Sequence, residues 1–270
     1  MKAQWIQFAL LLVFAGMATA TPAQTDSQLI NIPLSRPGEP VHLEISIVSA
    51  HIEVIGENRE DAQFEVSVLE GERKIITPSG TKNLTIGAYS VDIEERDNRI
   101  SLDTDWRANS VRIVARIPQS ADLDLETVNN GVIRVENITG SLSLQNTNGP
   151  ITATGISGSV IAESVNDDIE VSFNRLEGSG AMSLTSVNGD LILGLPADAG
   201  AELHLDSAEG EITSDFEVDV VPSKPVVTRD DRRGGVEVKV ESVIVAKVGG
   251  GGTVFRLKTL NGDVYIRKSD

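Results

Sequence analysis

The feature that most constrains the fold is an internal repeat between Leu123 and Phe216. An Asn, once replaced by Glu, recurs along this stretch and again near the end of the chain, at Asn130, Asn148, Asn166, Asn188, Glu209 and Asn261. The first two steps are 18 residues long, and the next two are 22 and 21. Gly follows the Asn or Glu at every position but one, where Asp167 stands: Gly131, Gly149, Gly189, Gly210 and Gly262. Self-similarity on this scale is typical of stacked repeat architectures.

Aliphatic residues recur at fixed distances from each Asn and alternate with polar residues, which indicates half-buried strands. They form three columns: Ile133, Ile151, Ile169, Leu191 and Ile212; Val135, Ala153, Val171 and Leu193; and Leu125, Leu144, Ala162, Leu184 and Leu205. One repeat offers about five such side chains, each worth roughly 1.5–3 kcal/mol when buried. Ordering about 18 residues costs on the order of 1–2 kcal/mol per residue. A single repeat is therefore unstable alone and needs neighbours on both sides.

The Asn-Gly pairs have two interpretations. Asn-Gly is a strong signal for a tight hairpin, which would give an antiparallel meander. It also suits a bend between two strands of one solenoid coil, where Asn tolerates left-handed φ and its side chain can bond the backbone or the Asn above. We favour the second, because the regular period and the aligned columns are not required of a meander. The predicted fold is all-β: a single-stranded parallel β-solenoid, or β-helix, with coils of about 18–22 residues.

The chain begins with the pattern of a secretory signal peptide over residues 1–20. Lys2 precedes an apolar run from Trp5 to Met17, and Ala18-Thr19-Ala20 resembles a cleavage site. A membrane anchor is the alternative, but the run is shorter than the roughly 20 residues that span a bilayer. No later segment is apolar for long enough to span one, so the mature chain is predicted to lack a transmembrane segment.

The remaining chain divides by pattern into consecutive parts. Residues 21–40 are a polar, extended lead-in, and 41–270 form the solenoid domain. Within that domain, 41–122 is a less regular β part, 123–216 holds the regular repeats, and 217–252 is an excursion that ends in a Gly-rich turn. Residues 253–270 are one closing repeat, which is predicted to cap the open edge of the stack.

Composition excludes several classes of function. The formal charge is −17, and removal of Lys2 makes it −18, which argues against binding nucleic acid or anionic lipid. The chain has no Cys, so it has neither thiol chemistry nor disulfides. Aromatic residues make up 4% of the chain, which is few for a carbohydrate-stacking groove. No cofactor is predicted. The expected partner is an unknown protein or polysaccharide, and the expected location is the periplasm, the cell surface or the extracellular space.

Three stretches resemble a bacterial putative-adhesin domain family of unknown function. They are Ser186-Val187-Asn188-Gly189-Asp190-Leu191, the link from Leu195 to Ala201, and the closing segment from Gly249 to Ile266. The resemblance covers roughly residues 41–270 and is clearest over 123–270. It implies an exported or envelope β-solenoid with an adhesive role, and it brings no catalytic residues.

An acidic column is the main candidate for chemistry. Two residues after the repeat Asn or Glu stand Asp168, Asp190, Glu211 and Asp263. Stacking would bring some of them about 5 Å apart. They could hold Ca²⁺, or act as acid and base on a glycan. The structural alternative, which we favour, is that Asp suits a turn and keeps the corner solvated. The three His (His42, His51 and His204) lack metal-ligand spacing.

The basic cluster Arg229, Arg232 and Arg233 is a candidate contact for an acidic partner, although Asp230 and Asp231 offset much of its charge. Three functions remain open at this stage. The first is a non-catalytic, exported, adhesin-like surface for binding or scaffolding. The second is a secreted polysaccharide-processing enzyme of the β-helix type, and the third is a self-assembling envelope protein.

Overall fold

The computed structural model describes residues 28–68, 91–104, 111–176, 180–221, 226–230, 237–241 and 243–269. The predicted signal peptide and the first residues of the lead-in lie outside these ranges. Every helix or strand assigned in the described ranges is a strand. No helix there is long and apolar enough to cross a membrane.

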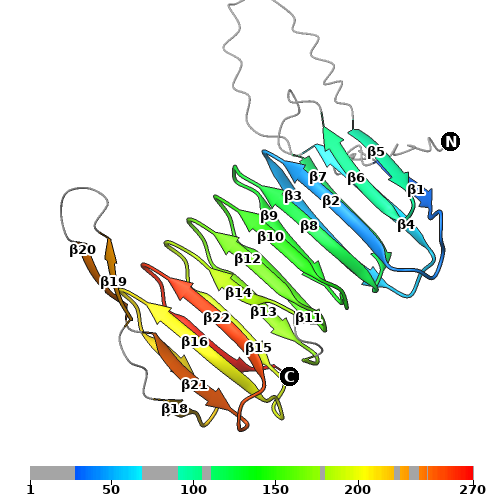
Figure 1. Cartoon of the computed structure of the whole chain (residues 1–270). Coiled ribbons are helices and arrows are strands. Elements are labelled where there is room, and N and C mark those ends of the chain that lie inside the picture. The colour runs from blue at the N-terminus through cyan, green and yellow to red at the C-terminus, as the bar shows by residue number, and fades with distance from the viewer. Residues whose placement is uncertain are drawn as a thin grey trace, which may run out of the picture.

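Two long sheets run the length of an elongated stack (Figure 1). Sheet A contains, in spatial order, β1 (Gln28–Pro33), β4 (Asp61–Val68), β7 (Val111–Pro118), β3 (Ala50–Glu57), β9 (Val132–Glu136), β11 (Ile151–Ile156), β13 (Ile169–Phe173), β15 (Leu191–Leu195), β23 (Val264–Lys268) and β17 (Ile212–Ser214). Sheet B contains β18 (Asp219–Val221), β21 (Ile244–Val248), β16 (Ala201–Ser207), β22 (Thr253–Thr259), β14 (Met182–Thr185), β12 (Val160–Ser164), β10 (Leu142–Asn146), β8 (Ala121–Thr127), β2 (Val41–Ile47), β6 (Arg99–Thr104) and β5 (Val91–Arg96). A separate hairpin pairs β19 (Val226–Asp230) with β20 (Glu237–Glu241).

The repeat unit is a rung of two strands, one in each sheet, and successive rungs pair in parallel. In sheet A, Ile133, Ile151, Ile169 and Leu191 are consecutive register partners. In sheet B the same holds for the column that begins at Leu125. Side chains alternate between buried and exposed, and the buried ones form one continuous core. The parallel pairing agrees with the predicted solenoid and excludes the antiparallel meander for these repeats.

The closing repeat does not cap the stack, so that prediction is wrong. Strand β22 pairs with β14 on one side and with β16 on the other. Strand β23 likewise lies between β15 and β17. The rung made by the last strands of the chain, which we call the C-terminal rung (Thr253–Lys268), is therefore inserted between two rungs that are consecutive in the sequence. The link from Pro196 to Gly200 carries the chain across it.

The first rung of the chain is inserted in the same way. Strands β2 and β3 lie between β6 and β8 in sheet B and between β7 and β9 in sheet A. Antiparallel strands close the two ends of the stack instead. At one end β4 pairs with β7, β1 with β4 and β5 with β6. At the other end β21 pairs with β16, and β18 with β21.

Candidate functional site

The repeat Asn residues lie at the bend from sheet B to sheet A, which we call the asparagine corner. Their side chains form a chain of hydrogen bonds along the stack. Asn166 Nδ2 donates to Asn148 Oδ1 at 2.6 Å, and Asn188 Nδ2 donates to Asn166 Oδ1 at 2.9 Å. Asn261 Nδ2 then donates to Asn188 Oδ1 at 2.7 Å. The order of this ladder places Asn261 of the C-terminal rung directly after Asn188.

The direction of the ladder gives a physical reason for the position of the C-terminal rung. Each Asn donates its amide N–H to the carbonyl oxygen of the rung before it. Glu209, the next corner residue along the chain, has a carboxylate and no N–H to donate. It therefore cannot extend the ladder from Asn188, whereas Asn261 can. Glu209 lies one rung further on, where its backbone N–H donates to Leu260 O at 3.0 Å.

Asn130 differs from the other corner residues. It has a left-handed backbone, with φ of 49°, as a bend residue is expected to have. It does not join the ladder, because Asn148 Nδ2 donates instead to Val128 O at 2.9 Å. The other corner Asn residues have no positive φ in the structure. The expectation that Asn is chosen for left-handed φ therefore applies to Asn130 alone, and side-chain bonding accounts for the rest.

The corner glycines permit close stacking of one bend on the next. A Cβ on Gly149 would overlap the carbonyl oxygen of Gly131, and one on Gly189 would overlap that of Asp167. Gly262 is in the same situation against Gly189. Buried hydroxyls lie beneath them: Ser186 Oγ accepts from the Gly189 N–H at 3.0 Å. The Asn-Gly repeat is thus a stacking device with its backbone groups bonded between rungs.

The acidic column forms a second ladder beside the first. Asp168 Oδ1 accepts the backbone N–H of Asp190, and Asp190 Oδ1 accepts that of Asp263, each at 2.8 Å. Asp263 Oδ1 accepts the backbone N–H of Glu211, also at 2.8 Å. Each of the three Asp carboxylates therefore holds the next rung by its backbone. No group of His, Asp or Glu side chains in the described ranges is arranged to hold a metal ion.

Asp263 is the most strongly engaged of these carboxylates. The N–H of Glu211 and the Tyr265 hydroxyl, at 2.9 Å from Oδ2, both donate to it. These hydrogen bonds outweigh desolvation and lower the pKa of Asp263 below its ordinary value of 3.8. The same bond raises the pKa of Tyr265 above its ordinary 10.0, because ionisation would remove the donated proton. Arg267 lies over the Tyr265 ring, 5.3 Å from its centroid.

The His and Arg candidates are dispersed. His204 contacts Glu202 at 3.0 Å, and this hydrogen bond lowers the pKa of Glu202. Among the described residues no His belongs to a metal-binding group. Arg229 belongs to β19, while Arg232 and Arg233 lie outside the described residues, so the predicted partner contact stays a prediction.

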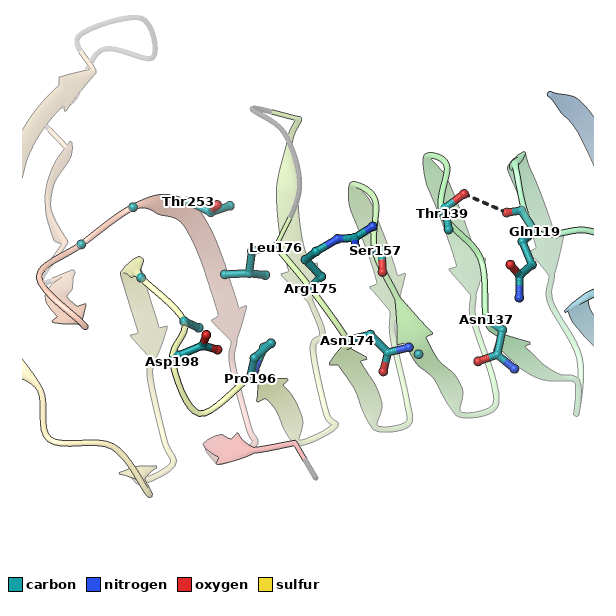
Figure 2. A pocket seen from close by; sticks show the side chains of 15 residues that line it. Gln119, Asn137, Thr139, Ser157, Asn174, Arg175, Leu176, Pro196, Asp198 and Thr253 are labelled. Atoms are coloured by element: carbon teal, nitrogen blue, oxygen red, sulfur yellow. Dashed lines mark hydrogen bonds between the residues drawn. The ribbon is translucent and has the colours of Figure 1, made fainter. Parts of the chain in front are cut away.

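The largest hollow described is a groove at the opposite bend, where the chain returns from sheet A to sheet B. Its volume is about 860 Å³, within the range usual for ligand pockets. Its lining comes from five successive links and from the turn before β22 (Figure 2), and consists of Gln119, Asn137, Thr139, Gly155, Ser157, Asn174, Arg175, Leu176, Pro196, Asp198, Ala199, Gly200, Gly251, Gly252 and Thr253. Four steps between rungs make the groove about 19 Å long.

The floor of the groove is held by backbone hydrogen bonds between rungs. Asn137 N–H donates to Thr154 O, and Asn174 N–H donates to Ile156 O, both at 2.9 Å. Thr139 donates to Gln119 O through its backbone N–H at 2.9 Å and its hydroxyl at 3.2 Å. Because the backbone is engaged in this way, the exposed side-chain amides of Asn137 and Asn174 remain to meet a ligand.

The groove presents amides and hydroxyls, one guanidinium and one carboxylate. In Figure 2 Arg175 reaches along the stack toward Ser157, and Asp198 lies across the groove beside Pro196. No aromatic residue is among the lining residues. None of the acidic-column residues lines it either. Sequence reasoning missed this groove. A weak signal was present, because Asn137, Gly155 and Asn174 recur at 18 and 19 residues.

Comparison with known proteins places the chain in a family. A family profile described as Toastrack DUF4097 matches residues 119–267, and no curated protein matches the chain. A putative cell adhesion protein from Clostridium sporogenes is 11% identical at a TM-score of 0.49, and the alignment covers 91% of this chain and 100% of that one. A putative adhesin from Bacteroides fragilis is 9% identical at a TM-score of 0.37, over 89% and 96%. One from Parabacteroides distasonis is 11% identical at 0.30, over 90% and 98%.

The matched residues contain the asparagine ladder, the regular repeats and the C-terminal rung, and they make up more than half of the chain. The likeness to a domain family of unknown function that the corner motifs indicated is thus confirmed, and this chain belongs to the Toastrack DUF4097 family.

Proposed function

We propose that this chain is a non-catalytic, exported protein of the cell envelope that binds an extended polar polymer along the groove. The observation that carries the proposal is the groove itself, which crosses five successive links with a polar lining. A polymer laid along the stack would meet an equivalent bend at each rung, about 4.8 Å apart. Stacked repeats with an extended surface are commonly used for such contacts.

The lining chemistry favours a ligand rich in hydroxyl, amide and carboxylate groups. Asn137, Asn174 and Thr139 offer neutral donors and acceptors, which suit the hydroxyls of a polysaccharide or the backbone of a polypeptide. Arg175 offers paired N–H donors for a carboxylate. With no aromatic residue in the lining, hydrogen bonds supply the recognition in place of stacking, and we expect modest affinity at a single groove.

The test is co-sedimentation of the mature chain with isolated bacterial cell-wall sacculi, with and without protease treatment of the sacculi. Binding that survives the protease identifies the polysaccharide, and binding lost with it identifies attached protein. Arg175→Glu should reduce the bound fraction by about tenfold, as loss of a charge-assisted bond and a new repulsion predict. Equal binding by wild type and Arg175→Glu would refute the groove as the site.

Arg134→Glu is the matched control. Arg134 is also an exposed Arg on a regular rung, but it lies on the outer face of β9 away from the groove. This variant changes the net charge by the same amount, so it should bind like the wild type. If both charge reversals weaken binding equally, the effect is one of net charge and the groove has no special role.

Export is part of the proposal and has its own measurement. The apolar run before Ala20 predicts that the chain is cleaved there on secretion. Mass spectrometry of the protein recovered from the periplasm or the medium should give a mature N-terminus near Thr21. An intact Met1 on protein recovered from the cytoplasm would contradict export.

A further inference from the structure

The C-terminal rung is an interior element that is also the end of the chain. Its two strands have partners on both sides, β14 and β16 in one sheet and β15 and β17 in the other. Because nothing described follows it except Ser269, it can leave its slot without any other segment being unthreaded. The regular rungs from 121 to 195 are each continuous with the chain at both ends and lack this freedom.

The slot it leaves is a complete binding site for two strands. Phe255 is inserted between Met182 and Leu203, and Val264 between Leu191 and Ile212. Both inserted side chains are at most 2% exposed. The corner ladders add polar specificity, since Asn261 donates to the Asn of one neighbouring rung at 2.7 Å. An empty slot would expose unpaired strand edges on both sides, which is a template for another strand.

The connection into this rung is a hinge of four glycines. Gly249, Gly250, Gly251 and Gly252 all have positive φ, from 57° to 159°. The turn must pass over β16, because Val248 and Thr253 lie on opposite sides of Ala201. Two strand spacings separate them, about 9.6 Å. A four-glycine segment can form this arch and can also extend, so it permits both a closed and an open connection.

From this placement we propose that the C-terminal rung is exchangeable, and that a second copy of this chain can supply it. Two chains that exchange residues 253–268 form a dimer in which each slot holds its partner's Thr253–Lys268. The contacts inside each slot are the same as in the monomer, so the balance is set by the hinge and by concentration. The closed hinge gives an effective local concentration on the order of millimolar. Exchange should therefore grow as the protein approaches that concentration.

The absence of cysteine from the chain allows a clean test by disulfide trapping in the full-length mature protein. Ser183 and Arg256 are register partners on the outer face of β14 and β22. Adjacent strands place such Cα atoms about 4.8 Å apart, within the range a disulfide spans. The variants S183C and R256C are mixed at high concentration under mild oxidation. A disulfide between the two different chains forms only when the rung of one occupies the slot of the other.

The control uses two strands that cannot exchange as a chain end. Ser143 and Ile161 are register partners on β10 and β12, in the middle of the chain. The mixture of S143C and I161C should give at least about tenfold less mixed disulfide than S183C with R256C, because only the second pair reports the swap. The double variant S183C/R256C at low concentration should close its disulfide within the monomer, which establishes the register.

A hinge variant tests the same proposal without any thiol. Deletion of Gly250 and Gly251 leaves three Cα steps between Val248 and Thr253, which reach about 10–11 Å when fully extended. That length leaves no room for an arch over β16, so the closed monomer is strained and the dimer fraction in light scattering should rise by about tenfold or more. The proposal is overturned if the S183C and R256C mixture gives no more mixed disulfide than the control while the double variant cross-links as a monomer. A hinge-deleted chain that is folded and monomeric at every concentration also overturns it.

Discussion

The inserted position of the C-terminal rung can be tested energetically at Phe255. This side chain is 2% exposed and lies between the side chains of the neighbouring rungs. Its ring also meets Phe173 edge-on, with centroids 5.5 Å apart and an angle of 75° between the planes. Phe255→Ala removes the core contacts on both sides and the aromatic pair together. A terminal cap would have a neighbour on one side only, so the cost of the substitution distinguishes the two positions.

The expected loss for Phe255→Ala is about 3–5 kcal/mol, the range for a fully buried Phe whose cavity does not collapse. The edge-on pair contributes about 0.5–1.5 kcal/mol of this. Ile212→Ala is the matched control, because Ile212 belongs to β17, the last strand of sheet A, and is only partly buried. It should cost about 1–2 kcal/mol, below the usual range for a buried Ile.

The assay is urea unfolding of both variants beside the wild type, with the free energy of unfolding taken from the midpoint and slope. Since a domain of this size is stable by about 5–15 kcal/mol, the Phe255→Ala loss is a large and measurable fraction. Equal losses for Phe255→Ala and Ile212→Ala would refute the interior position of the C-terminal rung, and with it the exchange proposal.

Three further predictions concern the two ladders. Gly189→Ala should cost about 1–3 kcal/mol in urea unfolding, because the new methyl overlaps the carbonyl oxygen of Asp167 and the bend must shift; an unchanged midpoint would show that the bends are not closely stacked. Asn188→Val should cost about 1–3 kcal/mol through the loss of two side-chain hydrogen bonds, and a stability equal to wild type would mean that the ladder contributes nothing. The pKa of Asp263 is lower folded than unfolded, so its contribution is present above its ordinary value of 3.8 and is lost as pH falls through the folded value. The melting temperature of wild type should therefore exceed that of Asp263→Asn at neutral pH and converge with it in acid, and a difference independent of pH would contradict this assignment.

The regular part of the fold was predictable because it depends on local periodicity. The column Ile133, Ile151 and Ile169 shows both the strand alternation and the step between rungs, and the structure pairs these residues in that order. The parallel direction followed from the same alignment, since equivalent residues can stack in columns only if the rungs run the same way. Each of these inferences uses neighbours in sequence that are also neighbours in space.

The order of the rungs was not predictable in the same way. The repeat at Glu209 follows Asn188 in the sequence, and reading the rungs in chain order placed Asn261 at the end. The information that reverses them is a single donor group: Asn261 can pass on the amide ladder and Glu209 cannot. Counting repeats treats the two residues alike, whereas hydrogen-bond chemistry separates them. The groove escaped detection because its residues come from links that share few side-chain types.

Insertion of both the first and the last rung has a consequence for how the chain reaches this structure. Strand β2 needs β8, about 80 residues later, and Leu184 of β14 needs Leu257 of β22, which is the partner 73 residues later. Pairings this distant close large loops before any contact offsets their entropy, which slows folding. A chain made from its N-terminus onward can form rungs 121–195 in order, yet it presents two open slots until the ends arrive. The last segment to be synthesised fills one of these slots, so the stack is completed only when the whole chain is present, and the slot remains available to another copy until then.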